Sequence, residues 1–268
     1  MSPESGTRTE IVAVGRELLT GRTVDTNSAW IAARLADVGA FVARIVAVDD
    51  DPAAIAREIA DARQRGAALV ITTGGLGPTL DDRTLAGVAA ALERRIVEHP
   101  AALAFVARRY AELAAAHAVA DAALTPPRRK MARLPDGAEP VDNAVGTAPG
   151  VLLRDGARVL LALPGVPAEM RAVFDAALPR LRDCLGAPAH LAEREVASGS
   201  GDESVITVAV ERVMDAVPGV YLKSLATGFA PDCNLRVRIT ARAATRAEAE
   251  ARAARAAERL AAELARLI

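Results

Sequence analysis

The sequence predicts an α/β fold with three layers, in which helices cover both faces of a parallel or mixed sheet, followed by a small α+β domain. Short apolar runs alternate with longer segments whose apolar residues recur at helical spacing, as far as about residue 183. Such alternation is typical of a parallel sheet. Beyond residue 188 the order of predicted elements changes. We therefore expect two domains, residues 1–185 and 186–268.

The first domain begins with an alternation of strands and helices. A strand is expected at 10–15, and a helix at 25–38 follows because its apolar residues have helical spacing. The next strand, at 41–48, precedes a helix at 52–65 that has a proline in its first turn and a glycine just after its end. A third strand, at 67–72, runs into a glycine-rich segment. These three strands should lie in one sheet.

The second half of this domain is more varied. Helices are expected at 82–92 and 100–117, and the proline-rich, basic segment 120–136 is expected to be a loop. Residues 151–161 predict a β-hairpin, because an Asp-Gly pair separates two apolar runs. A helix at 168–183 closes the domain.

The second domain has its own order of elements. After a linker at 186–188, we expect a strand at 190–197 and a helix at 203–217. Strands at 219–224 and 233–240 follow, and a helix from residue 245 carries a leucine stripe. The order strand, helix, strand, strand, helix predicts a small α+β unit.

Composition limits the classes of partner. The 33 Lys and Arg residues nearly cancel the 34 Asp and Glu residues, so no basic footprint for nucleic acid is present. No apolar run approaches the ~20 residues that span a bilayer, and residues 1–9 lack the apolar core of a signal peptide. We therefore expect a cytoplasmic protein that binds a small molecule, without a nucleic-acid or membrane partner.

The glycine-rich segment 72–82 is the strongest candidate for chemistry. Glycines let backbone N–H groups approach an anion closely, and a hydroxyl adds a further donor. Two adjacent carboxylates beside an anion make sense when a divalent cation lies between them. Simple helix capping by the acids is the alternative. The residues concerned are Gly74, Gly75, Gly77, Thr79, Asp81 and Asp82.

Segment 15–27 follows the first predicted strand. Because the carboxyl ends of parallel strands form the ligand crevice of an open sheet, Glu17, Asp25 and Asn27 should share a rim with the glycine-rich segment. We expect Glu17 to contribute to the metal site and Asp25 and Asn27 to orient ligand hydroxyls. For Asp25, capping of the next helix is an equally good explanation.

Two later segments, 142–150 and 163–170, complete the candidate site. The first has small residues, an amide and a hydroxyl that suit a loop over a ligand, although a plain turn explains it equally well. The second is a strand end followed by a helix N-terminus, a natural position for an anion. The candidate ligand residues here are Asn143, Gly146, Thr147, Pro164, Gly165 and Glu169. Lys130 is expected to stabilise charge on a leaving phosphate.

The motifs GRELLTGRTVDTN (15–27), TTGGLGPTLDD (72–82), DNAVGTAPG (142–150) and LPGVPAEM (163–170), in this order, resemble the N-terminal half of the CinA family of competence/damage-inducible proteins. That half is a molybdopterin-binding, MogA-like domain. The resemblance implies metal-dependent hydrolysis of ADP-ribose to AMP and ribose 5-phosphate, and at least a homodimer. Full-length relatives add a nicotinamide mononucleotide amidohydrolase domain; because this chain ends at Ile268, we expect it to lack that activity.

The resemblance leaves two points open. The family usually has Asp or Asn where this chain has Arg16. The metal, for which Mg, Mn and Co are all suitable, would be held by Asp82, Asp81 and Glu17. The alternative function is binding of a pterin phosphate, as in molybdenum cofactor biosynthesis, without hydrolysis.

Overall fold

The computed structural model describes residues 7–185, 190–225 and 235–267. The chain divides into a larger unit, residues 7–35 and 40–186, and a smaller unit built mainly from residues 187–268. The predicted linker at 186–188 lies outside the described residues. Each unit has a hydrophobic core of its own.

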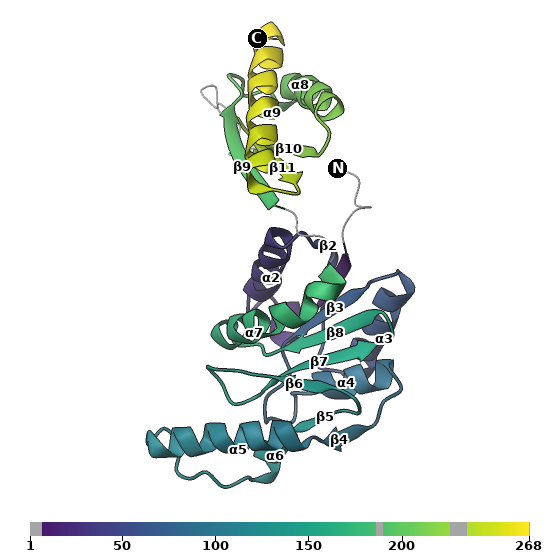
Figure 1. The fold of residues 1–268 in the computed structure, drawn as a ribbon, viewed down its shortest axis with the longest axis vertical. Helices are drawn as coiled ribbons and strands as arrows, with labels where there is room; N and C mark the ends of the chain where they lie inside the picture. The colour runs from purple at the N-terminus through teal and green to yellow at the C-terminus, as the bar shows by residue number, and fades with distance from the viewer. Residues whose placement is uncertain (1–6, 186–189, 226–234, 268) are drawn as a thin grey trace. The chain divides into compact units, whose positions relative to one another are not determined.

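A six-stranded mixed sheet forms the centre of the larger unit (Figure 1). In sheet order its strands are β2 (Phe41–Val48), β1 (Arg8–Val14), β3 (Leu69–Thr73), β8 (Arg158–Leu163), β7 (Gly150–Asp155) and β6 (Glu139–Val141). The first four are parallel, and β7 and β6 are antiparallel to their neighbours. Ala13 is level with Thr73, and Thr73 with Leu163, so β1, β3 and β8 end at the same edge.

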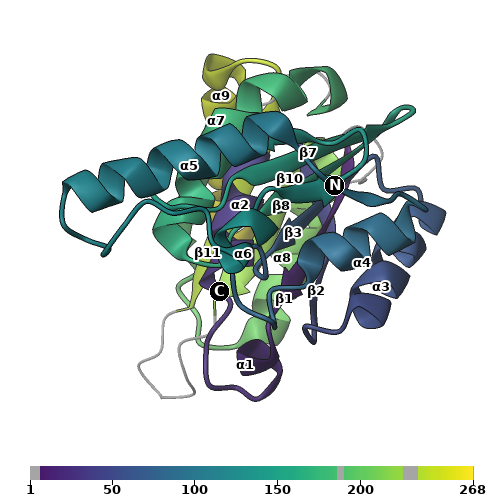
Figure 2. The same cartoon turned by 90° about the horizontal axis from the view of Figure 1, so that it is seen from below.

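Helices cover both faces of this sheet, as the sequence predicts (Figures 1 and 2). On one face lie α2 (Thr26–Asp37) and α7 (Pro167–Leu185), which touch through an edge-to-face contact between Trp30 and Phe174. On the other face, α3 (Pro52–Gln64), α4 (Thr84–Ala91) and α5 (Pro100–Ala115) enclose one apolar cluster with the sheet. Buried apolar side chains on both faces explain why the strands read as continuous apolar runs.

The segment 120–136, expected to be a loop, contains two short elements. These are α6 (Pro126–Lys130) and β5 (Arg133–Pro135), and β5 pairs with β4 (Ile96–Glu98). The adjacent prolines that indicated a loop stand in the first turn of α6, where a missing N–H costs nothing. Strands of three residues, including β6, are too short for sequence periodicity to reveal. A further helix, α1 (Arg16–Leu19), is a single turn.

The smaller unit is an α+β unit, as predicted. Its antiparallel sheet has the order β10 (Val220–Leu225), β11 (Arg236–Ala243), β9 (His190–Ala197). Helices α8 (Glu203–Ala216) and α9 (Arg246–Leu267) pack against the sheet through a shared apolar core. Among the described residues, no helix is both long enough and apolar enough to traverse a lipid bilayer.

Candidate functional site

A cavity of about 450 Å³ opens where β1, β3 and β8 end. The loops after these strands line it, together with part of the loop between β6 and β7. The predicted site residues that line it are Glu17, Asp25, Asn27, Gly74, Gly75, Gly77, Asp81, Asp82, Thr147, Pro164, Gly165 and Glu169. Thr79, Lys130, Asn143 and Gly146 do not line this cavity. The rule for parallel sheets thus places four separated segments around one space.

The loop after β3, which lines the cavity, carries unpaired backbone donors. Gly74 adopts a φ of +106° and donates its N–H to the carbonyl oxygen of Leu163 at 3.0 Å, so this amide is already used. The N–H groups of Gly75, Leu76 and Gly77 have no acceptor within the described residues. Three consecutive amides are therefore available to ligand oxygens, and Leu76 replaces Gly74 in the set of donors that we expected.

Packing of the loop against its neighbours requires glycine at positions 74 and 75. A β-carbon at Gly74 would lie 2.2 Å from the carbonyl oxygen of Val14, and one at Gly75 would lie 2.3 Å from Oγ1 of Thr84. Side chains at these positions would push the loop away from the strand ends. The glycines therefore bring the backbone close to β1 and to the start of α4.

Thr79 holds the two adjacent carboxylates. Its backbone N–H donates to Oδ2 of Asp82 at 2.8 Å, and its hydroxyl lies 2.6 Å from the same oxygen and also contacts the carboxylate of Asp81. The hydrogen bond from Thr79 is the main reason that the pKa of Asp81 is lowered, and the charge of Lys130 adds to this effect. The hydroxyl that we expected to contact ligand instead orients the acids.

Lys130 supports this loop from outside the cavity. Its ammonium group donates to the carbonyl oxygens of Gly77 at 3.0 Å, Thr79 at 2.6 Å and Asp82 at 2.6 Å. Burial lowers the pKa of Lys130, although the charges of Asp82 and Asp81 oppose that shift. An ammonium has three hydrogens, and all three are directed at the loop. In this structure Lys130 fixes the path of residues 77–82.

Asn27 and Asp25 begin α2 at the rim. Asp25 Oδ1 accepts the N–H of Ser28 at 2.9 Å, so Asp25 caps the helix while also lining the cavity. Asn27 donates through Nδ2 to Oγ1 of Thr73 at 3.0 Å and to the carbonyl oxygen of Gly165 at 2.7 Å. Asn27 is only 9% exposed, yet its Oδ1 has no hydrogen-bond partner among the described residues. This oxygen is an acceptor that a ligand hydroxyl or N–H would satisfy.

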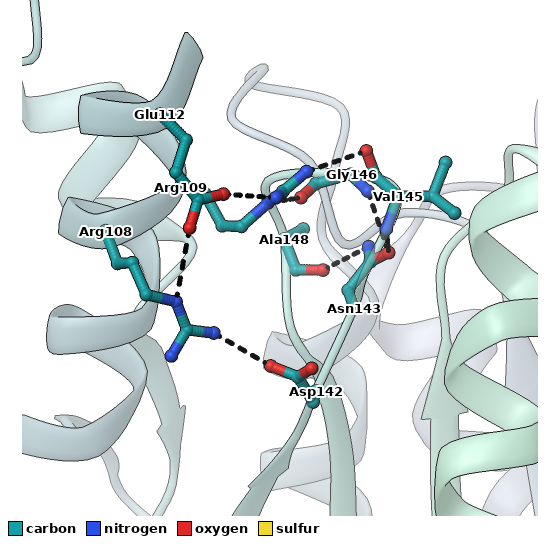
Figure 3. Close-up of polar contacts among 8 residues, drawn as sticks. All are labelled: Arg108, Arg109, Glu112, Asp142, Asn143, Val145, Gly146 and Ala148. Carbon is teal, nitrogen blue, oxygen red and sulfur yellow. Dashed lines mark hydrogen bonds and ion pairs between the residues drawn. The ribbon is translucent and has the colours of Figure 1, made fainter. Parts of the chain in front are cut away.

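Asn143 organises the loop between β6 and β7 (Figure 3). Its Nδ2 donates to the carbonyl oxygen of Ala148 and to Oε2 of Glu169, both at 2.8 Å. Its Oδ1 accepts the N–H groups of Val145 at 3.1 Å and Gly146 at 2.8 Å. Asn143 is fully buried, and every one of these bonds is internal. The side chain therefore shapes the loop and holds Glu169 in place.

Cations outside the cavity hold the same loop from α5. Arg109 donates to the carbonyl oxygens of Gly146 at 2.8 Å and Val145 at 3.1 Å, and Arg108 pairs with Asp142 at 3.0 Å (Figure 3). Gly146 packs so tightly that a β-carbon there would overlap the carboxylate of Glu169. Gly146 and Asn143 thus support the cavity wall, and Thr147 beside them reaches the cavity.

The cavity is strongly acidic. No Lys, Arg or His side chain lines it in the described ranges. Its acidic side chains are Glu17, Asp25, Asp50, Asp81, Asp82 and Glu169. Asp50 was not among the predicted residues, although it follows the carboxyl end of β2 and the same sheet rule would have found it.

Arg16 brings no positive charge into the cavity. Its guanidinium pairs with the carboxylate of Asp49 through two contacts of 3.0 Å, and its backbone N–H donates to Asp50 at 3.0 Å. The Arg16 side chain is the main reason that the pKa of Asp49 is lowered. Arg16 stands where the motif 15–27 usually has Asp or Asn. Its positive charge is balanced by the acidic residues that follow β2, Asp49 and Asp50.

The carboxylates of this cavity suit a metal ion that is held by a pair of protein ligands. Within the described residues, no three His, Cys, Asp or Glu side chains stand together as a coordination group, so Glu17, Asp81 and Asp82 do not form one. Carboxylate oxygens nevertheless suit a hard cation, and Mg²⁺ is commonly held by one or two carboxylates together with substrate phosphates. The adjacent Asp81 and Asp82 fit that second arrangement.

A family model, two sequence relatives and one solved structure are similar to this chain. A family model described as a probable molybdopterin binding domain matches residues 10–183. A protein of Aeropyrum pernix is 43% identical over 258 residues, which cover 96% of this chain and 93% of that protein. A CinA-like protein of Frankia casuarinae is 39% identical over 91% of this chain, which spans 55% of that protein. The crystal structure of CinA from Thermoplasma acidophilum, described as of unknown function, is 36% identical with a TM-score of 0.59, covering 65% of this chain and 98% of that one.

Proposed function

Since the chain belongs to the CinA-type family of probable molybdopterin-binding domains, we propose that it hydrolyses ADP-ribose with the help of a divalent metal ion. Water would add its oxygen to one phosphorus of the diphosphate, and the bond between that phosphorus and the bridging oxygen would break. The bridging oxygen would leave with the other phosphoryl group. The products would be AMP and ribose 5-phosphate.

One observation carries this proposal: free backbone amides and carboxylates meet in a single cavity that no cationic side chain of the described residues lines. The amides of Gly75, Leu76 and Gly77 suit the oxygens of a diphosphate. The six carboxylates would repel the same oxygens. A divalent cation between them resolves this conflict, which is why the proposed reaction depends on metal.

Asp82 and Asp81 would hold this ion together with oxygens of the substrate phosphates. When bound, the ion supplies charge neutralisation and activates water for attack on phosphorus. Thr79 keeps the carboxylates of Asp81 and Asp82 oriented by its hydrogen bonds to each of them.

The remaining residues bind and orient. The three free amides would hold the diphosphate, and Oδ1 of Asn27 would accept a hydrogen bond from a ribose hydroxyl. Asp25 fixes the start of α2 and thereby the position of Asn27. Lys130 acts on the loop carbonyls and is a positioning residue.

The proposal is tested by incubating the purified protein with ADP-ribose and Mg²⁺, Mn²⁺ or Co²⁺ and measuring AMP release. We expect release that stops on chelation. Asp82→Asn should lower it by about two orders of magnitude or more, because a neutral amide is a poor ligand for a hard cation. Asp175→Asn, at an exposed acid on α7 outside the cavity, is the matched control and should leave release unchanged.

The description of the family favours a second candidate, binding of a pterin phosphate without hydrolysis. The same free amides and the acceptor of Asn27 would serve a pterin with its phosphate. Absence of AMP release with all three metals, together with calorimetric binding of a pterin phosphate, would favour this candidate. A cytoplasmic homodimer remains the expected form, and sedimentation would measure the assembly.

A further inference from the structure

A second cavity of about 310 Å³ lies behind the glycine-rich loop. It shares Gly75, Leu76, Gly77 and Asp82 with the acidic cavity, so the loop forms a common wall. The start of α4, β4 and β5 form its other sides. A ligand part in this cavity would therefore be continuous with a diphosphate bound on the free loop amides.

The lining of the second cavity is chemically unlike that of the first. It is mainly apolar, and Asp82 is its one acidic residue in the described chain. The apolar side chains are Leu76, Leu80, Leu85, Ala86 and Ile96. Leu80 is 93% exposed, an unusual position for a leucine on a loop that is otherwise tied down by Lys130. A flat apolar group seated beside Leu80 would remove this side chain from water.

Three cationic residues line this cavity beside the apolar side chains; Lys130 donates to carbonyl oxygens of the loop, which leaves Arg83 and Arg133. The guanidinium groups of Arg83 and Arg133 have no hydrogen bond or ion pair within the described residues. Their neighbours Arg95 and Arg129, in contrast, pair with Asp136 at 3.5 Å and Glu98 at 2.7 Å. Planar guanidinium groups stack well on aromatic rings. A cavity with apolar side chains and two arginines that have no ion-pair partner in the described chain therefore suits a flat aromatic heterocycle.

We propose that this second cavity binds the nucleobase of a nucleoside diphosphate whose phosphates lie in the acidic cavity. The inference rests on the proposed function, because it takes the position of the diphosphate from there. A pocket of this volume is at the small end for ligand sites, so it accommodates one ring system and not a whole dinucleotide. The base would contact Leu80, Leu85 and Ile96 and stack against Arg83 or Arg133.

Binding of the two reaction products separates this inference from the proposed hydrolysis. AMP carries the base, and ribose 5-phosphate does not, so their affinities can be measured by calorimetry with Mg²⁺ whether or not the protein hydrolyses anything. The double variant Leu80→Ser, Arg133→Ala alters two exposed residues and should fold normally. Because stacking of one base contributes about 1–3 kcal/mol, we expect AMP affinity to fall by roughly tenfold or more. Affinity for ribose 5-phosphate should not change.

The variant Val208→Ser, Arg246→Ala removes a matching exposed apolar residue and an exposed arginine from the smaller unit, and it should bind AMP normally. Photolysis of bound 8-azido-AMP should label residues 80–86, 96 or 133. The inference is overturned if wild-type protein fails to bind AMP, if the label maps to 142–150 or 164–169, or if the double variant loses both products equally, which would mark an anion site. Retained AMP binding without ADP-ribose hydrolysis would count against the proposed function alone.

Discussion

At the scale of single residues, Lys130 illustrates how a charged side chain can act through the backbone of a loop. Its ammonium joins three carbonyl oxygens of the loop that carries Asp82, and none of its hydrogens points into the acidic cavity. Removing the ammonium leaves three carbonyls without their donor. The loop would then lose the fixed path that presents the amides and the acids together.

We therefore expect Lys130→Met to lower kcat/KM for ADP-ribose by roughly 10- to 100-fold, the effect of small misplacements at a reacting centre. The Michaelis constant and the metal concentration for half-maximal rate should both rise. Arg129→Met, at the adjacent exposed arginine, should have little effect. A Lys130→Met enzyme that loses kcat alone, with unchanged substrate and metal dependence, would instead indicate that Lys130 contacts the phosphate.

The buried carboxylate of Glu10 and the partly exposed guanidinium of Arg65 form a charge pair with a structural role. The Glu10 side chain is 2% exposed and receives hydrogen bonds of 2.7–3.1 Å from Arg65, while Arg8 lies 3.4 Å away. The pKa of Arg65 is raised, mainly by its hydrogen bonds to Glu10. Neither residue is near the candidate site, so their effect should appear in stability.

Arg65→Ala should reduce the free energy of unfolding by about 3 kcal/mol, because it leaves the buried carboxylate of Glu10 with the single, longer contact to Arg8. Urea denaturation followed by circular dichroism would measure this change. Arg246→Ala breaks an exposed pair with Glu250 and should cost at most about 0.5 kcal/mol. Equal losses in the two variants would show that Glu10 is compensated in some other way.

At the scale of elements, the N-terminus of α8 shows how a helix cap contributes to stability. Asp202 caps α8: its Oδ1 accepts the N–H of Ser204 at 2.9 Å and the hydroxyl of Ser204 at 2.6 Å. These hydrogen bonds lower the pKa of Asp202. A carboxyl group with a lowered folded-state pKa stabilises the fold above its unfolded-state pKa, and that contribution is lost as pH falls through the folded-state pKa.

Asp202→Ala should therefore lower the Tm at pH 7, and the difference from wild type should narrow below about pH 4, where unfolded Asp is protonated. Thermal unfolding at pH 7, 5 and 3 measures the trend. A difference in Tm that stays constant over this range would mean that the charge of Asp202 contributes nothing and only the loss of the cap geometry matters.

The same scale shows what the sequence could and could not predict. Strands of five or more residues, the helices that connect them and the edge at which the strands end follow from apolar periodicity and the rule for parallel sheets. That is why residues as separate as Asp25, Asp82 and Glu169 were placed at one cavity. The three-residue strands lack enough positions to show a period, and the prolines of α6 are equally compatible with a loop.

The residue roles at the site that differ from the prediction depend on hydrogen-bond partners. Gly74, Gly75 and Gly77 look equivalent in the sequence, but within the described part of the chain only the N–H of Gly74 donates to a carbonyl oxygen, that of Leu163. The roles of Thr79 and Asn143 likewise depend on which polar group folding brings beside them. A motif names the residue types at a site, whereas the division between ligand contact and loop support is decided by tertiary contacts.

At the scale of the whole molecule, the candidate site belongs to one unit. Every residue that lines the acidic cavity lies between Ala13 and Glu169, within the larger unit. The smaller unit has a separate core in which Leu260 is fully buried against the helices and sheet of that unit. Damage to this core should therefore lower the stability of the smaller unit without altering the chemistry of the cavity.

Leu260→Ala tests this separation. Truncating a buried leucine should reduce the free energy of unfolding of the smaller unit by about 2–5 kcal/mol, since it removes apolar contacts and leaves a cavity. Differential scanning calorimetry should show one transition moved to lower temperature and a second one unchanged. AMP release at 25 °C should equal that of the wild type. If release falls together with the first transition, the smaller unit takes part in the reaction, and the cavity residues between Ala13 and Glu169 are not sufficient for it.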